Sequence, residues 1–306
     1  MPRPPVTRRG LLGAAGVMAL TGGLTACSIR LESDAPAIPG IPTQGPPADT
    51  SALQATVRSR ESALSLLRQP SKGLQTALKP AYSTQLTRLQ AVMASAGMPE
   101  ATPSTTTPTT STVGFETFIR GELSAATFAR IAGVATTYLS MLASVSALDA
   151  AVALSPQGLA SAGPAPAWPT AAVPSAVAVG LLPAVREAVY GLEVIAAKTA
   201  LTGRALVTGT LHTMYPIRAQ LEAVAGDAAP PLHSTYLLDP EPRTDQARTT
   251  LGRRLLTAVV AACADQAVAT KGSADQVGAL LQVWGTVLTT SWTWGVAPVA
   301  FPGLTG

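Results

Sequence analysis

The sequence is poor in the residue types that most often carry chemistry. Its 306 residues include two cysteines and two histidines, and aromatic residues make up only 4%. Two histidines leave few candidates for acid–base or metal chemistry. The chain also lacks a phosphate-binding glycine loop, a Gly-x-Ser-x-Gly elbow and a His-Glu-x-x-His step. The sequence therefore favours a non-catalytic protein.

The beginning of the chain has the pattern of an export signal. Arg3, Arg8 and Arg9 precede an uncharged stretch rich in Gly, Ala and Leu at residues 10–24. The run Thr-Arg-Arg-Gly-Leu-Leu at residues 7–12 is typical of twin-arginine signals, which export folded proteins. A general secretory signal that happens to contain two arginines is the alternative. We predict that Arg8 and Arg9 direct twin-arginine export.

A lipid anchor is expected directly after this signal. The run Leu-Thr-Ala-Cys at residues 24–27 has the lipobox pattern. We predict a signal peptide with lipobox at 1–27, lipidation of Cys27, and a Pro-rich tether at 28–49. The partner of Cys27 is then membrane lipid, and the protein lies at the outer face of the cytoplasmic membrane.

The basic balance of the chain comes mostly from the signal. Cleavage before Cys27 removes three of the 21 basic residues and none of the 17 acidic ones, which leaves a net charge of +1. A near-neutral chain without a basic patch is not expected to bind nucleic acid. Cys263 would then be the single free cysteine, so no intramolecular disulfide can form, and its apolar neighbours predict a buried, inert thiol.

Helical periodicity dominates the rest of the sequence. Apolar residues recur at steps of three and four, and no alternation typical of strands competes with them. The clearest case covers residues 181–225, where two apolar stripes broken at Thr202-Gly203 predict a helical hairpin. The predicted fold class is all-α.

Proline-rich segments divide the helices into two predicted bundles. Four helical patterns, one running from Phe115 to about Gly133, predict an N-terminal helical bundle at 50–155. A Ser/Thr/Pro run at 102–112 is expected to be an exposed loop. A Pro/Ala-rich linker at 156–174 follows the N-terminal bundle and leads to the hairpin.

The second predicted bundle is a four-helix bundle at 175–306. Beyond the hairpin, the Pro-rich segment 230–242 is long enough to cross a bundle from end to end. Thr244 and Ser273 have the positions of helix N-caps, Ser273 within a capping-box pattern with Gln276. These caps begin the third and fourth helices of the bundle.

The final helical pattern has the composition of a membrane span but not its distribution. Residues 276–306 contain no charged residue. Polar residues including Gln282 and Thr286 recur on one side of the pattern, whereas Trp284 lies on the apolar side. This segregation favours an amphipathic bundle helix over a spanning one. We predict that Trp284 is buried and that Gln282 and Thr286 face polar surroundings.

Several stretches of the C-terminal half resemble one family. These stretches are Glu187-Ala188-Val189-Tyr190-Gly191, Ala196-Ala197, Arg218, Leu221 and the ending Val299-Ala300-Phe301-Pro302-Gly303-Leu304. Through them the chain resembles the ferritin-like lipoproteins of actinobacteria that carry domain of unknown function 4439, over roughly residues 180–306 and less distinctly over 142–154. It implies a ferritin-like four-helix bundle at the C-terminus, preceded by a second small helical bundle. The family has no established activity.

The chain departs from the family pattern where a metal site would be expected. The pattern places a Glu five residues before the tyrosine and often a His beside it, whereas this chain has Val185 and Arg186. A di-metal centre of ferritin-like type also needs Glu-x-x-His steps, and neither histidine provides one. We predict no metal site and no cofactor.

One polar constellation is a candidate site. Glu187 and Tyr190 lie at i and i+3 on one helix face, where a phenol can hydrogen-bond a carboxylate. Glu193 and His212 are the other candidates of this possible polar site. Simple contacts on the helix surface are the alternative interpretation.

Two functions follow from these observations. The first is a membrane-tethered, non-catalytic lipoprotein that binds an envelope protein or small ligand. The alternative is a metal-binding or redox ferritin-like protein, since folded export lets a cofactor be loaded in the cytoplasm. The sequence does not define an oligomeric state.

Overall fold

The described part of the chain is built from helices alone. The computed structural model describes residues 47–67, 73–101, 114–155, 166 and 168–304. Within these ranges the secondary structure is helical and includes no strand, which confirms the all-α class. The predicted signal, lipidation site and nearly all of the tether lie outside the described residues, as does the Ser/Thr/Pro run at 102–112.

The described residues up to 155 form five α-helices. They are α1 (Thr50–Leu66), α2 (Leu74–Ser95), α3 (Phe115–Glu122), α4 (Ala125–Gly133) and α5 (Thr136–Leu154). The prediction of one helix from Phe115 to Gly133 was wrong. Ser124 interrupts it with an extended backbone, and its side chain accepts a hydrogen bond from the amide of Thr127, so a new helix begins there.

The described residues 168–304 form four α-helices of 20 to 24 residues. They are α6 (Ser175–Lys198), α7 (Ala205–Ala225), α8 (Asp245–Gln266) and α9 (Ala274–Thr293). The predicted hairpin is confirmed: a 3-10 turn at Leu201–Gly203 separates α6 from α7. Both predicted caps are present, because Thr244 accepts from the amide of Ala247 and Ser273 from that of Gln276.

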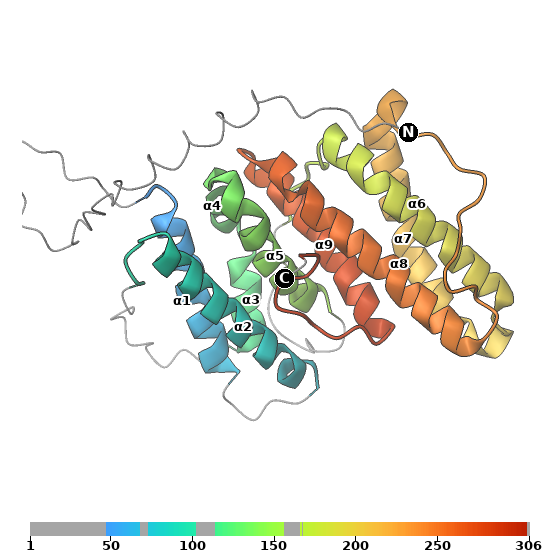
Figure 1. Ribbon diagram of the computed structural model, residues 1–306, viewed down its shortest axis with the longest axis horizontal. Coiled ribbons are helices and arrows are strands. Elements are labelled where there is room, and N and C mark those ends of the chain that lie inside the picture. The colour runs from blue at the N-terminus through green and yellow to red at the C-terminus, as the bar shows by residue number, and fades with distance from the viewer. Residues whose placement is uncertain (1–46, 68–72, 102–113, 156–165, 167, 305–306) are drawn as a thin grey trace, which may run out of the picture. The chain divides into compact units, whose positions relative to one another are not determined.

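Helices α6 to α9 pack in a ring. α6 and α9 each contact both α7 and α8. Two contacts show that α6 and α7 are antiparallel, since Arg186 pairs with Glu222 whereas Glu193 bonds Tyr215. Residues 229–244 connect α7 to α8 along the outside of the ring, from one end to the other (Figure 1). This long connection lets α8 run in the same direction as α7.

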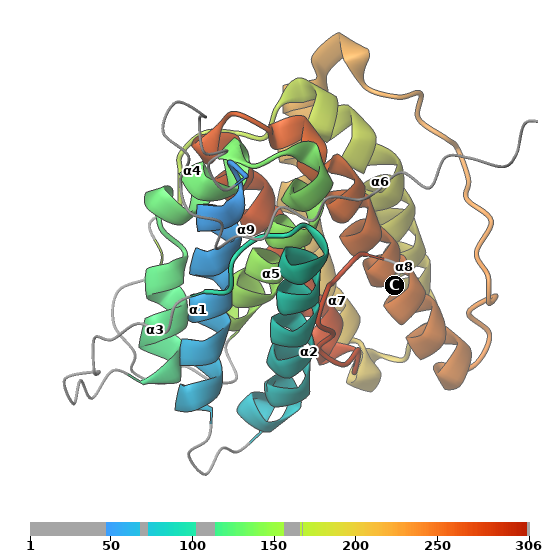
Figure 2. The ribbon, with the colours of Figure 1, turned by 60° about the vertical axis from the view of Figure 1, so that its left-hand side comes forward.

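The helices on the two sides of the predicted linker share one core. α5 packs along α9, and a Cβ atom on Gly285 of α9 would lie 2.7 Å from the Cβ of Ala150 in α5. One hydrophobic cluster contains buried residues of α1, α2 and α4 to α9. Pro46–Gly306 form one compact unit (Figure 2). The predicted boundary at 156–174 therefore does not separate two independent cores, because small side chains let α5 and α9 come into close contact.

The final helix packs as a bundle member. Trp284 is fully buried and Gln282 is exposed, as predicted, whereas Thr286 is half-buried. Among the described helices, α5 and α6 are long and apolar enough to cross a membrane by length and composition, which is weak evidence. Most of α5 and more than half of α6 are buried within the protein, as in core helices.

Candidate functional site

The structure does not bring the predicted polar residues into one site. Glu187 faces α8, where its carboxylate accepts from Arg254 at 2.9 Å. Glu193 is exposed and faces α7, where it accepts from the phenol of Tyr215 at 3.1 Å. The two carboxylates therefore bind different neighbours. Each contact is of the kind made by ordinary surface residues.

The other two candidates also lie apart. The ring of Tyr190 packs against Tyr236 of the long connection, with 5.4 Å between the ring centroids. His212 is exposed on α7. The predicted contact between Tyr190 and Glu187 does not form, because Glu187 pairs with Arg254 instead. These residues thus follow the surface-contact interpretation.

A buried polar network lies elsewhere, between α1, α2 and α5. The guanidinium of Arg60 in α1 binds both carboxylate oxygens of Asp149 in α5, at 2.8 and 2.6 Å. The phenol of Tyr82 in α2 donates to the same carboxylate at 2.6 Å. Gln85 and Ser59 accept the remaining Nη bonds of Arg60, at 3.2 and 3.0 Å. All five side chains are buried, so the network excludes water.

The network fixes the protonation states of Arg60 and Tyr82. Burial by itself would lower the pKa of Arg60, but the adjacent Asp149 carboxylate raises it above its usual value. Burial, reinforced by the negative charge of Asp149, raises the pKa of Tyr82 well above its usual value. Tyr82 is therefore a neutral donor, and Arg60 and Asp149 form a bidentate charged pair.

One sequence signal could have located this network. Asp149 is the only charged residue between Arg130 and Arg186. A lone carboxylate in an apolar helix is buried only with a partner, so it predicts an arginine or lysine nearby. The identity of that partner could not be predicted, since Arg60 lies 89 positions away in sequence.

The network continues to the end of the described chain. The amide of Gln85 donates to the carbonyl of Ala300 at 2.5 Å. The hydroxyl of Ser144 in α5 donates to the carbonyl of Pro302 at 2.8 Å. The segment 294–304, which follows α9, is thus bonded to both α2 and α5.

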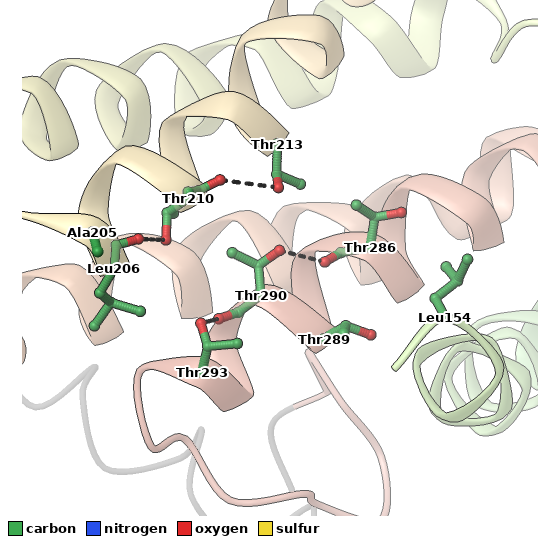
Figure 3. A pocket seen from close by; sticks show the side chains of 10 residues that line it. Leu154, Ala205, Leu206, Thr210, Thr213, Thr286, Thr289, Thr290 and Thr293 are labelled. Atoms are coloured by element: carbon green, nitrogen blue, oxygen red, sulfur yellow. Dashed lines mark hydrogen bonds between the residues drawn. The ribbon is translucent and has the colours of Figure 1, made fainter. Parts of the chain in front are cut away.

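An open groove lies between α7 and α9. It has a volume of about 420 Å³ and includes the end of α5. Its walls contain no charged residue and consist of Leu154, Ala205, Leu206, Gly209, Thr210, Thr213, Thr286, Thr289, Thr290 and Thr293 (Figure 3).

The hydroxyls of the groove are already bonded within the protein. Every threonine in its wall donates to a backbone carbonyl, as Thr290 does to Thr286 and Thr289 does to Ala151 of α5. Thr210 also accepts from the indole of Trp294 at 2.8 Å. Bonded hydroxyls leave the methyl groups as the main surface, so the groove is suited to apolar contact rather than to catalysis.

The donor set of a di-metal centre is not present in the ring. Such a centre needs carboxylates and histidines that point inward from the helices. In α6 to α9 no Asp, Glu or His side chain is buried. Across the described residues, no three His, Cys, Asp or Glu side chains form a group that could hold a metal ion. Burial raises the pKa of Cys263, so its thiol stays protonated.

Comparisons with protein-family models, with curated proteins and with solved structures find no match to this chain. The described residues define an all-α protein. Its function has to be argued from its own residues.

Proposed function

We propose that this chain is a lipid-anchored binding protein of the cell envelope. It is non-catalytic, is held at the outer face of the cytoplasmic membrane through Cys27, and binds an envelope protein or small ligand. The observation that carries the proposal is the groove between α7 and α9, which is open, uncharged and lined by methyl groups. A concave apolar surface of this kind is typical of binding sites.

The sequence supports the location of the protein. Arg8, Arg9 and the lipobox ending at Cys27 have the pattern of a twin-arginine lipoprotein signal. The Pro-rich tether at 28–49 would separate the helical unit from the membrane. Twin-arginine export suits a single helical unit that has folded before it crosses the membrane.

The arrangement of α6 to α9 supports a ferritin-like topology. Two antiparallel helices, a long connection along the outside and two further helices are the connectivity of ferritin-like bundles. The family resemblance is part of the same proposal. Because the inward-facing donors of a metal centre are replaced by apolar residues, this bundle would serve binding rather than redox chemistry.

Photo-crosslinking in cells tests the proposal. A photoreactive phenylalanine analogue replaces Thr213 in the groove or, as the control, the exposed Ala219 further along α7. We expect a crosslinked adduct from position 213 and none from position 219. An intact-mass shift would identify a small ligand, and a larger species on a gel would identify a protein partner.

Two results would contradict the proposal. Equal crosslinking at both positions, or at neither, would show that the groove is not a contact site. Metal analysis of the same preparation tests the alternative function. About two equivalents of iron or manganese per chain would favour a metal-binding protein instead.

A further inference from the structure

The hairpin of α1 and α2 is attached to the rest of the protein in an unusual way. The two helices pack closely against each other, and α1 also approaches α3. Among the described elements, α2 has no other helix backbone packed along it to a similar extent. Apart from the approach of α1 to α3, the hairpin therefore contacts the remaining helices mainly through its side chains.

The side chains between the hairpin and α5 include a charged pair. Ala63 and Leu78 of the hairpin belong to one buried hydrophobic cluster with Leu148 and Val152 of α5. In its middle, Arg60 and Tyr82 both bind Asp149 of α5. An ion pair inside an apolar interface costs desolvation free energy that its mutual attraction only partly offsets. The pair thus specifies how the hairpin docks without adding much to its binding.

A second contact joins the hairpin to the C-terminal segment. Gln85 of α2 both accepts from Arg60 and donates to Ala300, so the ion pair and the segment 294–304 are connected by one side chain. The far side of the segment lies close to α8, since a Cβ on Gly303 would lie 2.5 Å from the carbonyl oxygen of Val260. It therefore crosses from α8 to the hairpin.

The docked state also leaves a donor unsatisfied. The Nε of Arg60 is buried and has no hydrogen-bond partner in the protein. A buried donor without a partner raises the free energy of the docked state. Undocking would return this group, and both charges of the pair, to water. Undocking of a purely apolar interface would bring no comparable gain in hydration free energy.

We propose that the α1–α2 hairpin is a cover over α5 that opens as one unit. We call the Arg60–Asp149 pair and the Gln85–Ala300 bond its latch, since they fix the docked position and both break when the cover opens. When the cover opens, the charges become hydrated and the buried face of α5 is exposed, while the ring of α6 to α9 stays folded. This conformational device is independent of the groove and of any ligand that binds there.

Hydrogen exchange of the full chain in detergent tests the proposal, followed by mass spectrometry at peptide resolution. In the native protein, α1 and α2 should exchange together and faster than α6 to α8, with exchange of the two helices rising jointly at low denaturant. Asp149→Asn leaves Arg60 buried without its counter-charge. We expect protection in α1, α2 and residues 298–303 to fall about 100-fold or more, with α6 to α8 nearly unchanged.

Two further variants distinguish the loss of the latch from a general loss of stability. The combined variant Arg60→Met, Tyr82→Phe, Asp149→Leu replaces the ion pair and the phenol by apolar groups of similar size. The main remaining cost is the donor lost to the Gln85 side-chain oxygen, so protection of the hairpin should recover well above that of Asp149→Asn and approach the native level. Glu222→Gln weakens a half-exposed ion pair between α6 and α7 and serves as the control, which should leave the hairpin unchanged.

Three results would overturn the proposal. The first is native exchange in which α1 and α2 are as protected as α6 to α8. The second is a loss of exchange protection in Asp149→Asn that is equal in all helices, which includes complete unfolding. The third is a combined variant that is no better protected than Asp149→Asn.

Discussion

At the scale of single residues, Asp149 is a buried group with a large desolvation cost, and two side chains bind it. Asp149 is 2% exposed, and an isolated carboxylate at that depth would be expelled or neutralised. Arg60 and Tyr82 together supply three donors to it. The predicted polar residues on α6 contrast with this, since Glu187 binds Arg254, Glu193 binds Tyr215, and both carboxylates lie nearer to water.

The phenol of Tyr82 predicts a pH dependence of stability. Because burial and Asp149 raise its pKa in the folded protein, the unfolded chain releases the proton first, near pH 10. The contribution to stability is thus fully present below about pH 10 and is lost as the pH rises above it. Denaturant unfolding from pH 8 to 11 should show this decline. Tyr82→Phe should be less stable at pH 8 but should show a shallower decline.

A surface tyrosine provides the control for this measurement. Tyr215 is exposed and also has a raised pKa, owing first to burial and then to its bond with Glu193. Tyr215→Phe should change the pH profile much less than Tyr82→Phe. Identical profiles for Tyr82→Phe and the native protein would contradict the prediction.

Trp284 predicts a large loss of stability. Its side chain is fully buried in α9, and its indole nitrogen has no hydrogen-bond partner, so it contributes through packing. Trp284→Ala should cost about 3 to 5 kcal/mol of unfolding free energy. Thr286→Ala, on the half-buried groove side of the same helix, should cost less than about 0.5 kcal/mol. Chemical unfolding compares the two, and equal small losses would show that α9 does not pack as described.

At the scale of elements, close approach of two helices depends on a glycine. A Cβ on Gly285 would lie 2.7 Å from the Cβ and 2.9 Å from the carbonyl carbon of Ala150, and a backbone atom cannot move aside cheaply. Gly285→Ala should therefore destabilise the protein by about 1 to 3 kcal/mol, although alanine is the better helix former.

A glycine in α7 is the matched control for this prediction. A Cβ on Gly209 would meet no atom within 4 Å. Gly209→Ala should therefore stabilise the protein by up to about 1 kcal/mol, since only helix propensity changes. Thermal unfolding of both variants would show shifts of opposite sign. Stabilisation by both would mean that α5 and α9 are not in close contact.

At the scale of the whole molecule, attachment to the membrane should depend on one side chain. If Cys27 is lipidated, Cys27→Ala should release the protein into the soluble fraction, which cell fractionation measures. Persistent membrane association would point to an apolar helix as the anchor. α5 and α6 would be the first to examine, because they have the length and composition of spanning helices.

The limits of sequence prediction are clear for particular elements. Periodicity located the α6–α7 hairpin and the caps at Thr244 and Ser273, because these features depend on residues within a few positions of each other. The break between α3 and α4 was missed, although Ser124 is a good cap, because the apolar periodicity continues through it.

The sequence by itself determined the all-α class, the α6–α7 hairpin, the caps at Thr244 and Ser273 and the burial of Trp284, since these follow from local propensity and from the polarity of each helix face. Only the tertiary structure decided that α5 joins the core of α6 to α9. It also decided that Arg60 pairs with Asp149 and that the threonines of α7 and α9 form a groove. The physical reason is that these contacts join residues far apart in the chain. Their energies depend on which surfaces meet, and a periodic pattern contains no information about the partner.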